Sequence, residues 1–111
     1  MARKASLGEF EQLVLLAILR LKDDAYGLGI RKELETRARR SVSRGAFYAT
    51  LDRLERKGFV KWRAMPPTDS RGGLPQRRFE VTPAGVRTLR SARETLLSMW
   101  QGLDAVLEVR K

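Results

Sequence analysis

Two residue types are missing from this chain, and their absence excludes several kinds of chemistry. The 111 residues include no cysteine and no histidine. Without cysteine there is no disulfide framework and no thiolate metal site, and a reducing cytoplasm is the expected location. Without histidine the commonest general base and the commonest metal ligand are lacking too. Because no phosphate-binding glycine loop or converging carboxylate pair replaces them, the sequence predicts no enzyme, no cofactor and no metal.

Long apolar runs are also scarce. The longest, Leu13 to Leu19, has seven residues, whereas a membrane-spanning helix needs about 20. This run follows a basic N-terminus, as in a signal peptide, but Glu9 and Glu11 interrupt the pattern and no small-residue cleavage site follows. We interpret the segment as a helix of the mature protein and expect no membrane partner.

Negative charge is the minority sign in this chain. There are 23 Lys and Arg against 13 Asp and Glu, which gives a net charge of +10 and a pI of about 11.0. The excess is largest over residues 41–81, with nine basic and four acidic side chains. Such a balance favours a polyanionic partner, nucleic acid first and an acidic membrane surface second. A generally basic surface without a polyanionic partner is the alternative.

Hydrophobic periodicity predicts two helices before residue 41. A capping box from Ser6 to Glu9 opens the first, which runs to about Leu21 and is apolar on most sides. So small a domain cannot cover all those sides, which suggests that a second chain does. A second helix is expected from residues 25–27 to about residue 38, with Arg37, Arg39 and Arg40 at its end. These cations either complement the helix dipole or contact phosphate.

A third helix and a hairpin follow at once. Ser43 is a good N-cap and Gly58 ends the helix, with Phe47, Leu51 and Leu54 on its apolar side. Two strand-like runs, at 60–65 and 77–81, flank a loop rich in proline and glycine. The predicted fold is therefore mainly α with a small β-hairpin. Its order is that of a winged helix-turn-helix over residues 1–82.

The last helix has more apolar surface than this domain can bury. Thr82 and Pro83 open it, and a nearly heptad stripe predicts about 28 helical residues, roughly 42 Å, reaching the C-terminus. We expect residues 83–111 to pair with their copy in a homodimer, although folding back on the domain is the alternative. The predicted interface comprises Phe10, Val14, Val86, Leu89, Leu96, Trp100, Leu103 and Leu107.

The third helix and the hairpin supply the candidate residues for double-stranded DNA. Small residues on the outer side of the helix let its backbone approach base edges, and basic residues there and on the hairpin suit phosphate. Gly45 could instead be a loose first turn, and Tyr48 a half-buried core residue. A winged-helix module that binds protein instead of DNA is the alternative function. The candidates are Ser43, Arg44, Gly45, Tyr48, Ala49, Arg53, Arg56, Arg71, Gly72, Gly73 and Arg77.

Trp100 suggests an effector site in the dimer. A plain coiled-coil seam would more often carry Leu or Ile at this position, and two copies could approach each other across a two-fold axis. A flat aromatic molecule could stack against them, with Phe10, Leu96 and Met99 lining the site. The alternative is that Trp100 simply fills the interface.

Several segments, taken in order, carry a resemblance that covers nearly the whole chain. They are LGEFEQLVLLAIL from Leu7, AYGLGIRKELE from Ala25, SRGAFYATLDRLERKGFV from Ser43, RGG from Arg71, RRFEVTPAG from Arg77, and residues 96–103. The chain thereby resembles the PadR-type transcriptional regulators, in particular the short subgroup with one C-terminal helix. The resemblance implies a homodimeric DNA-binding regulator, usually a repressor, whose last and first helices form the dimer. In some members a small apolar or aromatic effector binds in or near that interface and releases the DNA.

Overall fold

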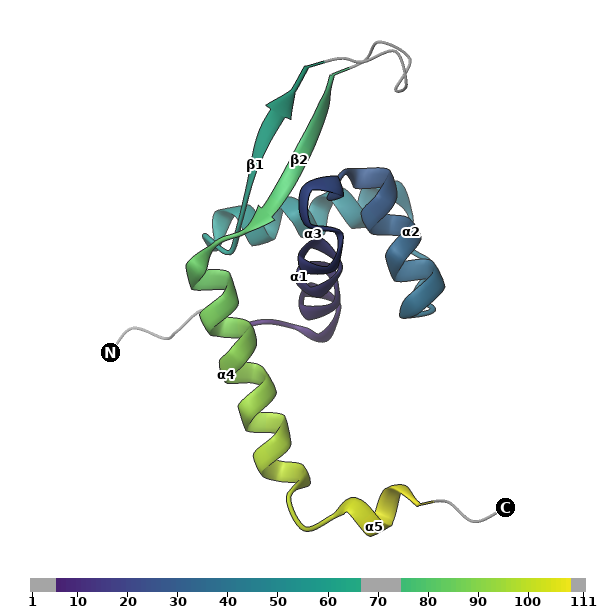
Figure 1. Ribbon diagram of the computed structural model, residues 1–111, viewed down its shortest axis with the longest axis vertical. Coiled ribbons are helices and arrows are strands. Elements are labelled where there is room, and N and C mark those ends of the chain that lie inside the picture. The colour runs from purple at the N-terminus through teal and green to yellow at the C-terminus, as the bar shows by residue number, and fades with distance from the viewer. Residues whose placement is uncertain (1–5, 67–74, 109–111) are drawn as a thin grey trace.

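A computed structural model describes residues 6–66 and 75–108 of the chain (Figure 1). The predicted mainly α architecture with a small hairpin is confirmed. The elements are, in order, α1 (Glu9–Leu21), a 3-10 helix η1 (Lys22–Asp24), α2 (Gly27–Arg37), α3 (Arg44–Arg56), β1 (Val60–Met65), β2 (Gln76–Val81), α4 (Pro83–Trp100) and α5 (Asp104–Leu107).

The core lies where α1, α2 and α3 pack together at the base of the hairpin. The apolar face predicted for α3 is confirmed, since Phe47, Leu51 and Leu54 are all buried. Burying side chains of this size contributes about 1.5–3 kcal/mol each. The other buried apolar residues are Val14, Leu15, Ala17, Ile18, Ala25, Ile30, Leu34, Phe59, Val60, Phe79 and Leu89.

The start of α1 differs from the prediction. The N-cap is Gly8, two residues after the predicted Ser6, and the Glu11 carboxylate accepts a hydrogen bond of 2.8 Å from the Gly8 N–H. Glycine has no side chain with which to cap, so the carboxylate one turn into the helix satisfies the backbone group in front of it. The same carboxylate is buried and pairs with Arg53 of α3 and with Lys57, the residue that follows α3.

The hairpin, or wing, is antiparallel and attached at its base to α2. The Phe79 N–H donates a 2.9 Å hydrogen bond to the Ala25 carbonyl, just before α2 begins. Trp62 pairs with Phe79 and Ala64 with Arg77, so these four side chains share one face of the wing. Gly58, with φ +80°, makes the turn from α3 into β1. In Figure 1 the wing rises from the helical body on the side opposite α4.

The last helix begins as predicted but ends early. Thr82 Oγ1 accepts a 3.1 Å hydrogen bond from the Gly85 N–H and donates one of 2.6 Å to the Gly58 carbonyl. The prediction that one helix continues to the C-terminus is wrong, because α4 stops at Trp100. Gln101 adopts φ −55° and ψ 127°, and Gly102 takes φ +83°, a conformation that a right-handed helix cannot contain.

Two helical glycines should respond oppositely to an added methyl group. A Cβ on Gly85 would lie 2.5 Å from the Phe59 carbonyl oxygen and 2.7 Å from Val81 Cγ1, whereas one on Gly45 would have no neighbour within 4 Å. We expect Gly85→Ala to lower the free energy of unfolding by about 1–3 kcal/mol through overpacking. Gly45→Ala should raise it by about 0.5–1 kcal/mol through helix propensity. Urea unfolding measures both, and changes of the same sign would contradict this packing.

Candidate nucleic-acid interface

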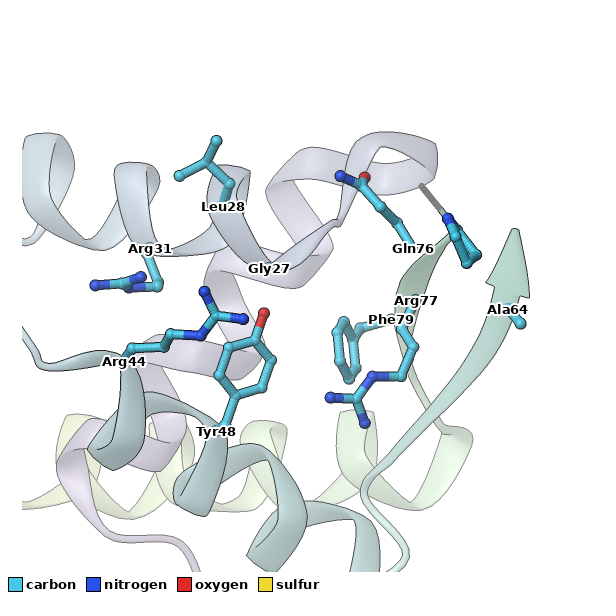
Figure 2. Close-up of a pocket in the computed structure, with 10 residues that line it drawn as sticks. Gly27, Leu28, Arg31, Arg44, Tyr48, Ala64, Gln76, Arg77 and Phe79 are labelled. Atoms are coloured by element: carbon cyan, nitrogen blue, oxygen red, sulfur yellow. The ribbon is translucent and has the colours of Figure 1, made fainter. Parts of the chain in front are cut away.

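A cleft of about 710 Å³ opens between the start of α2, the start of α3 and one face of the wing. Its walls come from segments far apart in the sequence, and Figure 2 shows their side chains converging on it. Among the described residues, no acidic one lines it. The lining residues are Gly27, Leu28, Arg31, Arg44, Tyr48, Ala64, Pro75, Gln76, Arg77 and Phe79.

Tyr48 forms the floor between α2 and α3. Its ring packs edge-on against Phe47, with centroids 5.1 Å apart and planes at 73°. Its hydroxyl reaches the first residue of α2, where a Cβ on Gly27 would lie only 2.2 Å from it. Only glycine at this position lets the ring occupy the space. Tyr48 is therefore half-buried in packing while its polar end lies at the cleft.

Three guanidinium groups make the cleft electropositive. The Arg44 guanidinium lies 5.6 Å from the centroid of the Tyr48 ring, and that of Arg77 lies 5.5 Å from it. Arg31, on α2, donates to the Val42 carbonyl at 3.4 Å. The N–H groups in the first turn of α2 have no partners within their helix and add partial positive charge. Because these cationic groups have no carboxylate beside them in the described part of the lining, the cleft suits an anion such as a phosphate.

The exposed side of α3 continues from this cleft. Gly45, Ala49 and Arg56 are exposed, as predicted for a surface that approaches DNA. Ser43 is the N-cap, and its Oγ accepts a 3.1 Å hydrogen bond from the Ala46 N–H. Its hydroxyl hydrogen is still available to an outside acceptor. The start of α3 therefore offers small side chains, a hydroxyl and Arg44 on one surface.

Arg53 lies on the other edge of α3 and already has an anionic partner. Its Nε donates to Glu11 Oε2 at 2.9 Å, and Lys57 Nζ lies 2.9 Å from the same oxygen. Burial would raise the pKa of Glu11, but hydrogen bonds from the Gly8 N–H, Lys57 and Arg53 outweigh it and hold that pKa below 4.5. A phosphate contact by Arg53, predicted from its position, would have to compete with this pair.

Removing the Glu11 charge should weaken the α1–α3 contact in a pH-dependent way. We expect Glu11→Gln to lower the free energy of unfolding by about 2 kcal/mol at pH 7, since two cations lose their partner. Because folding lowers this pKa, the stabilisation is present above 4.5 and is lost as the pH falls through the lower folded value. Urea unfolding of both proteins between pH 7 and pH 3 should therefore show the difference shrinking, and a constant difference would contradict it.

The other predicted DNA contacts and basic residues divide into two groups. Arg71, Gly72 and Gly73, at the predicted hairpin tip, lie outside the described residues. At the end of α2, Arg37 pairs with Glu33 at 3.0 Å and Arg40 pairs with Glu9. These pairs favour the structural interpretation of the two arginines over phosphate contact.

Sequence analysis missed three residues of this region. Arg31 lines the cleft from α2, and Leu28 lies beside it on the same helix with 72% of its surface exposed. Trp62 lies on the wing face that carries Arg77, whose guanidinium is 5.0 Å from the Trp62 ring centroid. Strand alternation could have placed Trp62 on that face. No local sequence pattern could have shown that α2 lies near the wing, because these distant segments come together only in the folded chain.

The predicted dimer residues lie in three different environments. Val14 is fully buried within the single chain, so the prediction that it contacts a second chain is wrong. The reason is that Val14 points from α1 into the three-helix core. Leu89 is 9% exposed. Phe10 and Val86 are half-buried. The remaining four, which are exposed, are Leu96, Trp100, Leu103 and Leu107, of which the last two follow the break after α4.

The predicted effector residues are not gathered in one hollow of the single chain. A cavity of about 690 Å³ lies between the N-terminal part of α1 and α4. Leu96 lines it, but Phe10, Met99 and Trp100 do not. Met99 and Trp100 are 70% and 40% exposed at the end of α4. An effector site that contains all four would need a second chain to complete it.

Comparison with known proteins places this arrangement in a family. The model of the transcriptional regulator PadR-like family matches residues 15–91, which include α2, α3 and the wing. The chain belongs to the PadR-like family of transcriptional regulators. This is a family of regulators and not of enzymes. None of the curated proteins matches the chain.

Solved structures share the fold of this PadR-like protein. A PadR-like transcription factor from Bacteroides fragilis is 21% identical with a TM-score of 0.68, covering 87% of this chain and 88% of its own. A PadR-family regulator from Eggerthella lenta is 24% identical with a TM-score of 0.66, at 92% and 88% coverage. One from Bacillus cereus is 17% identical with a TM-score of 0.70, at 91% and 93% coverage. Within residues 6–66 and 75–108, no helix is both long and apolar enough to cross a membrane.

Proposed function

We propose that this PadR-like regulator is a cytoplasmic homodimer that binds a specific sequence of double-stranded DNA and represses transcription there. The observation that carries the proposal is the cleft, where Arg31, Arg44 and Arg77 converge beside Tyr48 and no carboxylate is found among the described lining residues. Guanidinium groups and helix N-termini are the usual partners of DNA phosphates. Because the chain belongs to a family of transcriptional regulators, the anion that we expect it to bind is DNA.

The binding mode follows from the geometry of the exposed surfaces. The start of α3 enters the major groove, where Gly45 and Ala49 allow close approach and Arg44 reaches a base edge. A backbone phosphate occupies the cleft, and the wing lies along the adjacent backbone. Arg53 is left out of this surface because it is paired with Glu11. In this binding mode residues 1–82 are the DNA-binding unit and residues 83–111 are the dimerisation unit.

Exposed apolar side chains support the dimer. Seven large hydrophobic residues between 96 and 107 are at least 40% exposed, and Leu16 and Leu19 of α1 are 45% and 41% exposed. Large exposed apolar patches mark interaction sites in soluble proteins, so these exposed side chains support an interface. In the proposed dimer α4 packs with its copy and with α1. A small aromatic or apolar effector bound beside Trp100 and Met99 would release DNA by favouring another spacing of the two α3 helices.

Selection from a random duplex library tests the proposal. We expect enrichment of one sequence and a steep salt dependence, in which the affinity falls about 10³-fold or more between 50 and 200 mM salt if six or more phosphates are contacted. Fluorescence anisotropy on the selected duplex and on an unselected duplex measures both. No enrichment, together with weak binding that ignores salt, would favour a protein-binding module instead.

A further inference from the structure

Arg77 is surrounded by aromatic rings. Its guanidinium lies 5.0 Å from the centroid of Trp62, 5.5 Å from that of Tyr48 and 5.5 Å from that of Phe79. All three lie within the roughly 6 Å at which a cation attracts an aromatic face. Within residues 6–66 and 75–108, no carboxylate forms an ion pair with Arg77. The rings are therefore what holds this charge in place.

The three rings belong to different elements. Trp62 on β1 and Phe79 on β2 are cross-strand partners on one face of the wing, and Arg77 lies on the same face opposite the small Ala64. This small neighbour leaves room for the Arg77 side chain to lean diagonally onto Trp62. Tyr48 is the only ring of the three outside the wing, because it lies on α3. Arg77 thus connects the wing to α3, as Figure 2 shows for Arg77, Phe79 and Tyr48.

The contact between Arg77 and Tyr48 lies nearer the wing tip than the backbone contacts that attach the wing to α2. The hydrogen bond from the Phe79 N–H to the Ala25 carbonyl fixes the base of the wing against the start of α2. Next to it, Arg78 forms an antiparallel β-bridge with Tyr26, and beyond this bridge Arg77 contacts the helical body through Tyr48. The contact of Arg77 adds a side-chain attachment beyond these backbone ones, so the wing cannot pivot about its base without separating Arg77 from Tyr48.

We propose that Arg77 is a positioning residue that holds the wing at a set distance from α3, with Trp62 as its platform. The inference rests on the proposed DNA-binding function. A guanidinium stacks through its flat face and keeps its N–H donors at the edge, so Arg77 can stack on the rings and still offer donors to a phosphate. Trp62, which is not among the proposed DNA contacts, thereby becomes a determinant of DNA affinity.

The docking of Arg77 can be measured without DNA. The chain has two tryptophans, so a Trp100→Phe background leaves Trp62 as the one fluorophore of this type. Arg77→Ala should raise the quenching of Trp62 by acrylamide, because the guanidinium no longer covers the ring. The matched control is Arg63→Ala, which removes the same charge from the opposite face of the wing and should leave quenching unchanged. Circular dichroism verifies that each variant is folded.

The effect on DNA is measured with the other tryptophan intact. Trp62→Leu should weaken binding to the selected duplex about two- to fivefold, the size of an exposed cation–π contact. It should leave the slope of log affinity against log salt unchanged, since no charge is removed. Trp62→Phe keeps a ring and should retain most of the affinity. Arg77→Lys keeps the charge, and so the slope, but loses affinity because an ammonium cannot stack as a plane.

The outcomes separate this inference from the proposed function. Unchanged quenching in Arg77→Ala overturns the docking of Arg77 even if wild-type DNA binding is strong and specific. Wild-type affinity in Trp62→Leu, or full affinity in Arg77→Lys, overturns the positioning role and leaves Arg77 a simple phosphate contact. If the wild-type chain selects no duplex, the proposed function fails, and the role of Trp62 in DNA affinity fails with it.

Discussion

Replacing both Leu96 and Trp100 with aspartate is expected to convert the proposed dimer into a monomer and to lower affinity for the selected duplex about 100-fold or more. The two residues are one helical turn apart on α4, and they are 55% and 40% exposed in the single chain. In the proposed dimer both are covered by the second chain. Two carboxylates buried there without partners cost several kcal/mol.

The loss of DNA affinity follows from the loss of the second half-site. In a dimer the second recognition helix binds at a high effective concentration, which contributes 10²–10⁴-fold in typical bivalent systems, so about 100-fold is the lower end. Sedimentation velocity at micromolar concentration measures the association state, and anisotropy measures the affinity. The matched control is Ser98→Asp, which places a charge on the opposite, exposed side of the same helix. A double variant that remains dimeric would place the interface elsewhere.

The second large effect is expected at Arg44. Arg44→Ala should reduce the preference for the selected duplex over an unselected one by about 1–3 kcal/mol, which is the worth of a bidentate contact to a base edge. Arg44 opens α3 and has no carboxylate partner within the described residues, so its donors are available. Arg56→Ala is the matched control, because it removes the same charge from the last turn of the same helix.

The two arginine variants should differ in kind. Arg56→Ala should weaken selected and unselected duplexes alike, as expected for a phosphate contact. Equal losses on both duplexes for Arg44→Ala would refute its role in recognising a base. They would leave Arg44 as a second phosphate ligand of the cleft, beside Tyr48 and Arg77.

The sequence predicted the helices and strands well because caps, periodicity and turn residues act over only a few neighbouring residues. The N-caps Ser43 and Thr82 both form the predicted hydrogen bonds, and β1 has the predicted bounds. The end of α4 was missed although Gly102 is a standard stop signal. The periodicity of Leu103 and Leu107 favoured a longer helix, but side-chain periodicity does not compensate for a glycine with φ +83°.

Contacts between distant segments were beyond local signals. Arg44, Tyr48 and Arg77 were each predicted as DNA contacts, but nothing in the sequence showed that they share one cleft. Glu11 and Arg53, which form an ion pair, are 42 positions apart in the sequence. Helical periodicity had predicted Arg53 as a DNA contact, whereas the ion pair gives it a role in stability. Val14 was misassigned for a similar reason. An apolar residue on a helix that is apolar on most sides can face the core or a partner, and only packing decides which.

A hydroxyl-radical footprint of the wild-type protein on the selected duplex tests most directly whether the protein binds DNA as a two-fold dimer through α3. A two-fold dimer that places α3 in the major groove should protect two half-sites whose centres are about 10–10.5 base pairs apart, or a multiple of that spacing. Each half-site should also show protection of the adjacent backbone by the wing. A single protected stretch without two-fold symmetry, or uniform weak protection along the duplex, would contradict the account.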